Sequence, residues 1–237
     1  MANELERAQR FARELQAVYG EELVSVVLYG SAARGEYQEG VSDLNLLVLL
    51  RDADAAALRR GSALARGWVQ QGNPPPLLLP AEEWRGSADV FPIEYADMRD
   101  AHRVLHGADP FTGIEIQPRH LRLQCESELK GKQIQLRERY LLSAGEPDEL
   151  RELLTRSVST FLVLFRTVLR LTGDAVPRPH DAVVRATAER VGFDAAPLLQ
   201  ILEARRGAGT LRPGADDAVV TGYLEAVART VAFVDRL

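Results

Sequence analysis

The spacing of apolar residues differs between the first and second parts of the chain. In the first part, short apolar runs rich in β-branched residues alternate with stretches whose apolar residues recur every three or four positions. The runs predict strands, and the three-to-four spacing predicts amphipathic helices. We therefore expect helices over 3–19 and 54–70, and strands over 23–29, 43–50, 77–79 and 90–96.

Beyond residue 118 the helical period continues almost without interruption. Glycine- and proline-rich breaks separate five expected helices, and the second of them is apolar around much of its circumference, as a central bundle helix is. We expect a domain of class α/β (α+β) with a small mixed sheet over 1–117 and an all-α helical bundle over 118–237. The five helices are expected at 119–143, 147–172, 180–191, 195–205 and 215–236.

The length and charge of the chain narrow its class. Its 237 residues suit two small cores better than one. Residues 1–118 hold 11 basic and 18 acidic side chains, and residues 119–237 hold 18 and 16. Neither half is basic enough for nucleic-acid binding to be expected. The acidic first half would instead attract a cationic small molecule.

The single cysteine and the N-terminal residues exclude further classes. Cys125 has no second cysteine to pair with, so an internal disulfide and a cysteine-based zinc cluster are excluded, and a packed thiol is expected. The acidic start over 1–6 does not resemble a signal peptide, and no apolar stretch is long enough to span a bilayer. We expect a cytoplasmic protein with no membrane association.

The residues that carry chemistry follow the first predicted strand. Gly30 at its end lets backbone N–H groups approach a ligand closely, and a helix that begins at Ser31 would add donors for a phosphate. Arg34 lies one turn further on and can add its guanidinium to this phosphate-binding site. Asp43, at the start of the next strand, can hold Mg²⁺ against the phosphates, and Ser42 precedes it.

Each of these residues also has a purely structural interpretation. Gly30 and Ser31 are compatible with a tight turn and a serine N-cap, and Asp43 with a polar strand end. Glu94, in the strand expected over 90–96, can be a solvent-facing carboxylate, and Asn45 can cap the strand by hydrogen bonds. His102 and His106 are four residues apart, which on a helix would place them on one face, but no third metal ligand is evident.

The segment 23–96 resembles the DNA polymerase β-like nucleotidyltransferase superfamily. Its signature is a hydrophobic strand, Gly-Ser, a spacer, Asp-x-Asp at the start of the adjoining strand, and a third carboxylate later. Gly30 and Ser31, then Asp43, then Glu94 occupy these places in order. A trailing helical bundle also accompanies stand-alone bacterial members such as the aminoglycoside nucleotidyltransferases. The resemblance implies a nucleotidyltransferase-like fold for the first domain.

The resemblance also implies the roles of the site residues, with one departure. Asp43, Asn45 and Glu94 would be the catalytic residues and the Mg²⁺ ligands. Asn45 stands where the family has its second aspartate, and an amide lacks the charge with which a carboxylate bridges two cations. Binding of the nucleoside triphosphate would fall to the turn and its neighbours, namely Gly30, Ser31, Arg34 and Ser42.

Two functions follow, from different classes. The first is Mg²⁺-dependent transfer of a nucleoside monophosphate from a nucleoside triphosphate to a small-molecule or protein acceptor, of which a small molecule is favoured. The second is a catalytically degenerate nucleotide-binding or interaction module, including an antitoxin-like protein that acts through its helical domain. Asn45 favours the second. A homodimer is compatible with either function.

Overall fold

A computed structural model describes residues 2–35, 37, 43–143, 145–214 and 216–237 of the chain. The chain divides into two compact units, Met1–Ile116 and Gln117–Leu237, each with its own core. The first unit is built on a sheet and the second on helices alone, which confirms the fold class expected from the sequence.

The sheet of the first unit has four strands in the order β3-β2-β1-β4. β1 lies between β2 and β4 and is antiparallel to both, whereas β2 and β3 are parallel, so the sheet is mixed, as predicted. The pairing places Tyr29, the last residue of β1, opposite Asn45 on one side and His102 on the other. The strands are β1 (Leu23–Tyr29), β2 (Asn45–Leu50), β3 (Leu77–Pro80) and β4 (His102–Gly107).

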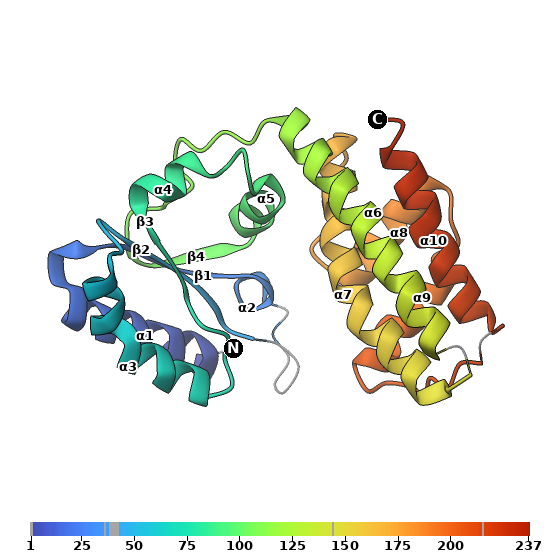
Figure 1. Cartoon of the computed structure of the whole chain (residues 1–237), viewed down its shortest axis with the longest axis horizontal. Coiled ribbons are helices and arrows are strands. Elements are labelled where there is room, and N and C mark those ends of the chain that lie inside the picture. The colour runs from blue at the N-terminus through green and yellow to red at the C-terminus, as the bar shows by residue number, and fades with distance from the viewer. Residues whose placement is uncertain (1, 36, 38–42, 144, 215) are drawn as a thin grey trace. The chain divides into compact units, whose positions relative to one another are not determined.

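Helices cover both faces of this sheet (Figure 1). α1 (Ala2–Tyr19) and α3 (Ala55–Gln70) pack on one face, in a core that includes Trp68. α4 (Ala81–Gly86) and α5 (Pro92–Asp100) pack on the other, in a core that includes Trp84. A 3₁₀ turn, η1 (Gly20–Glu22), precedes β1, and the single-turn helix α2 (Ser31–Arg34) follows it. Residues of β2 alternate between the two cores, because successive side chains of a strand point to opposite faces, and both faces are buried, as the continuous apolar runs predicted.

The strand predicted over residues 90–96 is wrong. Residues 90–96 were expected to form a strand, but Pro92 begins helix α5 at its first position, where proline is favoured because its missing N–H has no intrahelical partner. Glu94 therefore lies in the first turn of a helix. The segment that carries His102 and His106 is the strand β4, so the two histidines lie near its opposite ends, about 13 Å apart at the usual strand rise, and not on one helical face.

The second unit is a five-helix bundle, as predicted. α7 contacts each of the other four helices, and most of its circumference is buried, which confirms it as the central helix. No helix in the described part of the chain has the length and apolar character to cross a membrane. The helices are α6 (Pro118–Ser143), α7 (Pro147–Leu171), α8 (His180–Val191), α9 (Ala196–Arg205) and α10 (Ala218–Val234).

Candidate functional site

The turn after β1 has a backbone that requires glycine. Gly30 has φ 82° and ψ −149°, a region open almost only to glycine. Its N–H donates to Ala101 O at 3.1 Å, and its carbonyl accepts from Arg34 N at 3.0 Å. The N–H groups of Ser31, Ala32 and Ala33 are the first of α2, where donors have no partner within the helix. Because α2 is a single turn, these donors, and not a helix dipole, would bind a phosphate.

The side chain of Asn45 lies directly beside this turn. A Cβ atom on Gly30 would stand 3.2 Å from Asn45 Nδ2. Asn45 shares a face of β2 with Leu47 and Leu49, which belong to the core under α4 and α5, because alternate strand residues point the same way. Tyr29 packs on that core as well, and burial raises the pKa of its phenol, so its hydroxyl stays protonated.

Asp43 is exposed and stands two residues before Asn45. Ser42, also predicted to bind phosphate, lies outside the described residues. Within the described residues, no three His, Cys, Asp or Glu side chains are grouped so that they could hold a metal ion. The possible metal ligands here are the carboxylate of Asp43 and the neutral amide of Asn45. Since Mg²⁺ binds through one or two carboxylates together with substrate phosphates, this set fits one Mg²⁺ shared with a nucleotide and not a pair of metal ions.

Glu94, the third residue of the predicted metal site, is exposed in the first turn of α5. The far end of this helix meets the Gly30 turn, because Ala101 accepts the Gly30 N–H. Glu94 precedes Ala101 by seven residues, a separation of about 10 Å along a helix axis. The carboxylate is therefore carried on the helix that contacts the turn, about two turns of helix away from that contact.

Arg34, predicted to bind phosphate, is bound by Asp97 of α5. Arg34 Nη2 donates to Asp97 Oδ2 at 2.6 Å and to Asp97 O at 3.4 Å. The two side chains are only 9% and 18% exposed, so the guanidinium is largely withdrawn from solvent. Asp97 was not predicted to be a site residue, because residues 90–96 were interpreted as a strand. The available signal was its position three residues after Glu94, which on a helix makes the two carboxylates neighbours.

His102 is a second residue that the sequence analysis did not place at the site. It is the cross-strand neighbour of Tyr29, and its ring lies 4.6 Å from that of Phe111. His102 Nδ1 is 2.9 Å from Arg99 O, so this nitrogen carries a proton and donates it. His102 Nε2 is 3.3 Å from Asp109 Oδ2. The imidazole thus connects the end of α5 to the loop after β4.

Cys125 is fully buried in α6, as expected for a packed thiol. Burial raises the pKa of this thiol to about 12, so almost none of it is thiolate at neutral pH. Cys125 is therefore a packing residue and not a nucleophile.

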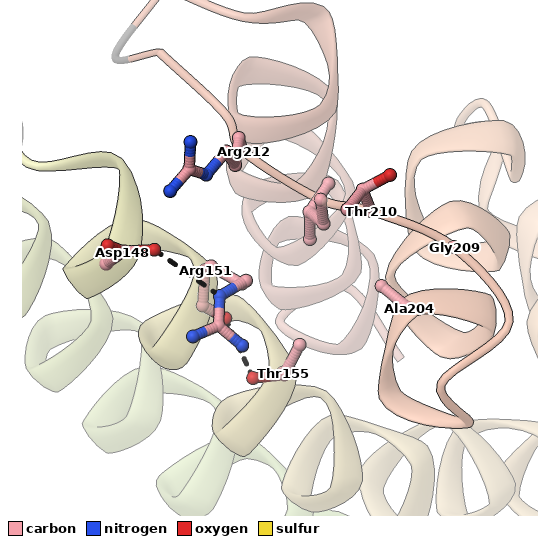
Figure 2. A pocket seen from close by; sticks show the side chains of 8 residues that line it. Asp148, Arg151, Thr155, Ala204, Gly209, Thr210 and Arg212 are labelled. Atoms are coloured by element: carbon pink, nitrogen blue, oxygen red, sulfur yellow. Dashed lines mark hydrogen bonds and ion pairs between the residues drawn. The ribbon is translucent and has the colours of Figure 1, made fainter.

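A pocket of about 260 Å³ lies in the helical unit, and no predicted site residue is among those that line it (Figure 2). Its polar groups carry both charges: Arg151 Nε is 3.8 Å from Asp148 Oδ1, and Arg212 adds a second guanidinium. Thr155 uses its hydroxyl within α7, where it donates to Arg151 O. The pocket is lined by Asp148, Arg151, Thr155, Ala204, Gly209, Thr210, Leu211 and Arg212.

Comparison with known proteins bears on the sheet-containing unit first. Residues 8–98 match the model of the nucleotidyltransferase domain family. This match spans β1, the Gly30 turn, Asp43, Asn45 and Glu94. No curated protein matches the chain.

Several solved structures are similar to the chain, over different shares of its length. Spectinomycin adenyltransferase AAD(9) from Enterococcus faecialis, in a crystal structure with ATP and spectinomycin, is 14% identical and has a TM-score of 0.58. The match covers 97% of this chain and 99% of that one, and at this identity it shows the fold alone. A toxin-antitoxin structure with AMP-PNP is 20% identical over 43% of this chain and 74% of that chain, and its TM-score of 0.30 supports no argument. Taken with the family match, the geometry around Gly30 makes residues 8–98 a nucleotidyltransferase domain of the DNA polymerase β-like superfamily.

Proposed function

We propose that the chain transfers a nucleoside monophosphate from a nucleoside triphosphate to a small-molecule acceptor. The observation that carries this proposal is the Gly30 turn, held at a glycine-only backbone conformation beside Asn45, within a segment that matches the nucleotidyltransferase domain. The structural relative AAD(9) was crystallised with ATP and spectinomycin, which supports a triphosphate and a small-molecule acceptor as the two substrates. The acidic first half of the chain favours a cationic acceptor.

The residues of the chain take distinct parts in this transfer. The N–H groups at the start of α2 and the Ser31 hydroxyl hold the triphosphate against the turn. An oxygen of the acceptor hydroxyl attacks the α-phosphorus and forms the new P–O bond. The bond from that phosphorus to the β-phosphate oxygen breaks, and pyrophosphate leaves with its electron pair. Glu94, as an exposed carboxylate on α5, accepts the acceptor's proton.

Asp43 and the amide oxygen of Asn45 would hold one Mg²⁺ together with the triphosphate. When bound, Mg²⁺ neutralises charge that develops on the phosphate oxygens. The amide of Asn45 also has an N–H₂ group, which faces the turn and can donate to a phosphate oxygen. Asn45 therefore orients the triphosphate whichever end of its amide meets the ligand.

Calorimetry and a transfer assay test the proposal directly. The purified chain is titrated with ATP and GTP, with and without Mg²⁺, and pyrophosphate release is measured over a panel of cationic small molecules. Asp43→Ala should lower release by at least about 100-fold, since the carboxylate that would hold Mg²⁺ beside Asn45 is lost. Asp52→Ala, at an exposed aspartate beyond the other end of β2, should leave it unchanged. Pyrophosphate release that is unchanged in Asp43→Ala would contradict the proposed role of Asp43.

A second function is favoured by Asn45 itself, which offers a neutral amide and not a carboxylate two residues after Asp43. In that case the chain binds a nucleotide without transferring it and acts as an interaction module. Tight nucleotide binding with no pyrophosphate release over the whole acceptor panel would select this function. A cytoplasmic location and a homodimer are further proposals, which cell fractionation and sedimentation of the purified chain would test.

A further inference from the structure

The Arg34–Asp97 pair joins the phosphate turn to the helix that carries Glu94. Both hydrogen bonds from Arg34 Nη2 end on Asp97, one on its carboxylate and one on its backbone carbonyl. An arginine that binds phosphate directly needs an open guanidinium, but this side chain is 9% exposed. Its charge is already neutralised by a carboxylate at 2.6 Å.

A second contact ties the same turn to the same side of α5. Gly30 N–H donates to Ala101 O at 3.1 Å, and Ala101 is the C-cap of α5, four residues after Asp97. The two ends of the turn are thus fixed to α5, Arg34 to Asp97 within the helix and Gly30 to its C-cap. Glu94 lies one further turn along, three residues before Asp97, on the side that Asp97 presents to α2.

We propose that Arg34 and Asp97 are positioning residues, which set the phosphate turn at a fixed separation from Glu94, and that Arg34 is not a ligand of the triphosphate. The inference rests on the proposed function, because it assigns the turn to the triphosphate and Glu94 to the acceptor. It replaces the role that the sequence predicts for Arg34 with an indirect one.

A double-mutant cycle separates positioning from direct binding. Arg34→Ala, Asp97→Ala and the double variant are compared by calorimetry with ATP and by kcat and KM for pyrophosphate release. If the pair acts as a unit, each single variant weakens ATP binding and lowers kcat by about tenfold, and the double variant is no worse than either. If Arg34 binds phosphate directly, Asp97→Ala frees the guanidinium and ATP affinity is kept or increased. That second result would overturn the inference.

Two further variants make the comparison specific. Arg34→Lys keeps the charge and should restore part of the lost kcat, which a general loss of packing would not allow. Arg60→Ala removes an exposed ion pair with Glu22 in the same unit and should change neither ATP affinity nor kcat. Thermal unfolding of every variant verifies that it is folded.

Hydrogen exchange of the amides over 30–35 provides a readout that needs no nucleotide. Exchange should be faster in both Arg34→Ala and Asp97→Ala and unchanged in Arg60→Ala, because the turn loses its tie to α5. Unchanged exchange in both pair variants would refute the positioning role even if the chain binds no ATP. Absence of ATP binding by the unmodified chain would refute the proposed function alone, so the two failures are distinguishable.

Discussion

The two ends of strand β1 use polar residues in opposite ways. At its beginning, Ser25 is buried and its hydroxyl donates to Ala108 O at 2.9 Å, while Gly107 of β4 packs on the backbone of Val24. At its end, Asp43 is exposed and Asn45 lies beside Gly30. Both ends have a glycine with positive φ: Gly107 at 75° and Gly30 at 82°.

The difference shows how structural and functional polar groups can be distinguished in one sheet. At the beginning of β1 the polar groups are used within the fold, since a buried hydroxyl without a partner would be destabilising. At its end, Asp43 stays exposed, and the first N–H groups of α2 have no partner within their helix. Substitutions at the beginning of β1 should therefore affect stability, and those at the end should affect ligand binding.

The largest effect is expected for Gly107→Ala. A Cβ atom at Gly107 would overlap the carbonyl oxygen of Val24, so β4 would have to shift from β1. Together with the strained φ, this should lower the free energy of unfolding by about 3 kcal/mol or more. Chemical denaturation followed by fluorescence measures the loss.

Gly113→Ala is the matched control for that substitution. Gly113 has nearly the same φ, 78°, but nothing lies within 4 Å of a Cβ atom there. The free energy of unfolding of Gly113→Ala should fall only by the cost of the backbone conformation, about 1 to 2 kcal/mol. Equal losses in the two variants would mean that the Val24 contact does not matter, and the contrast between the two ends of β1 would weaken.

Asn45→Asp should have the next largest effect, and its sign should depend on Mg²⁺. With Mg²⁺, the added carboxylate supplies a second ligand and should tighten ATP binding by about tenfold. With a chelator, the same carboxylate repels the triphosphate beside Gly30 and should weaken binding. Calorimetry under both conditions gives the comparison. Equal affinities in both conditions would argue against a metal site at this end of β1.

The smallest effect is expected for Ser25→Ala. The substitution removes a hydroxyl that is 1% exposed and leaves the carbonyls of His106 and Ala108 without that donor. The free energy of unfolding should fall by about 1 kcal/mol, with no change in ATP affinity. A weaker affinity would mean that the beginning of β1 also influences the ligand site.

The sequence predicted most elements because their periods were long or their ends well marked. The five bundle helices and the strands β1, β2 and β3 were recognisable from spacing and from glycine and proline breaks. The strand predicted over residues 90–96 was wrong because a short apolar run fits a strand and a buried helix equally well. Proline at position 92 was interpreted as an edge-strand residue, although it is also the favoured first residue of a helix.

Placement of the candidate site was limited by the same error. The closeness of Gly30 to Asn45 follows from local order, since a turn and the start of a paired strand must adjoin. The binding of Arg34 by Asp97 depends on where α5 lies on the sheet, which no local pattern specifies. The position of His102 beside Tyr29 required the register of β4, and a bulge between Val26 and Val27 shifts that register.

Both tryptophans of the chain are buried in the first unit, Trp68 in the core under α1 and α3 and Trp84 in the core under α4 and α5. The bundle over 117–237 contains none. Intrinsic tryptophan emission therefore reports on the unit that carries the nucleotide turn, with one fluorophore on each side of its sheet. Far-UV dichroism is dominated by the helices of both units, so a difference between the two melting curves would show the units unfolding separately.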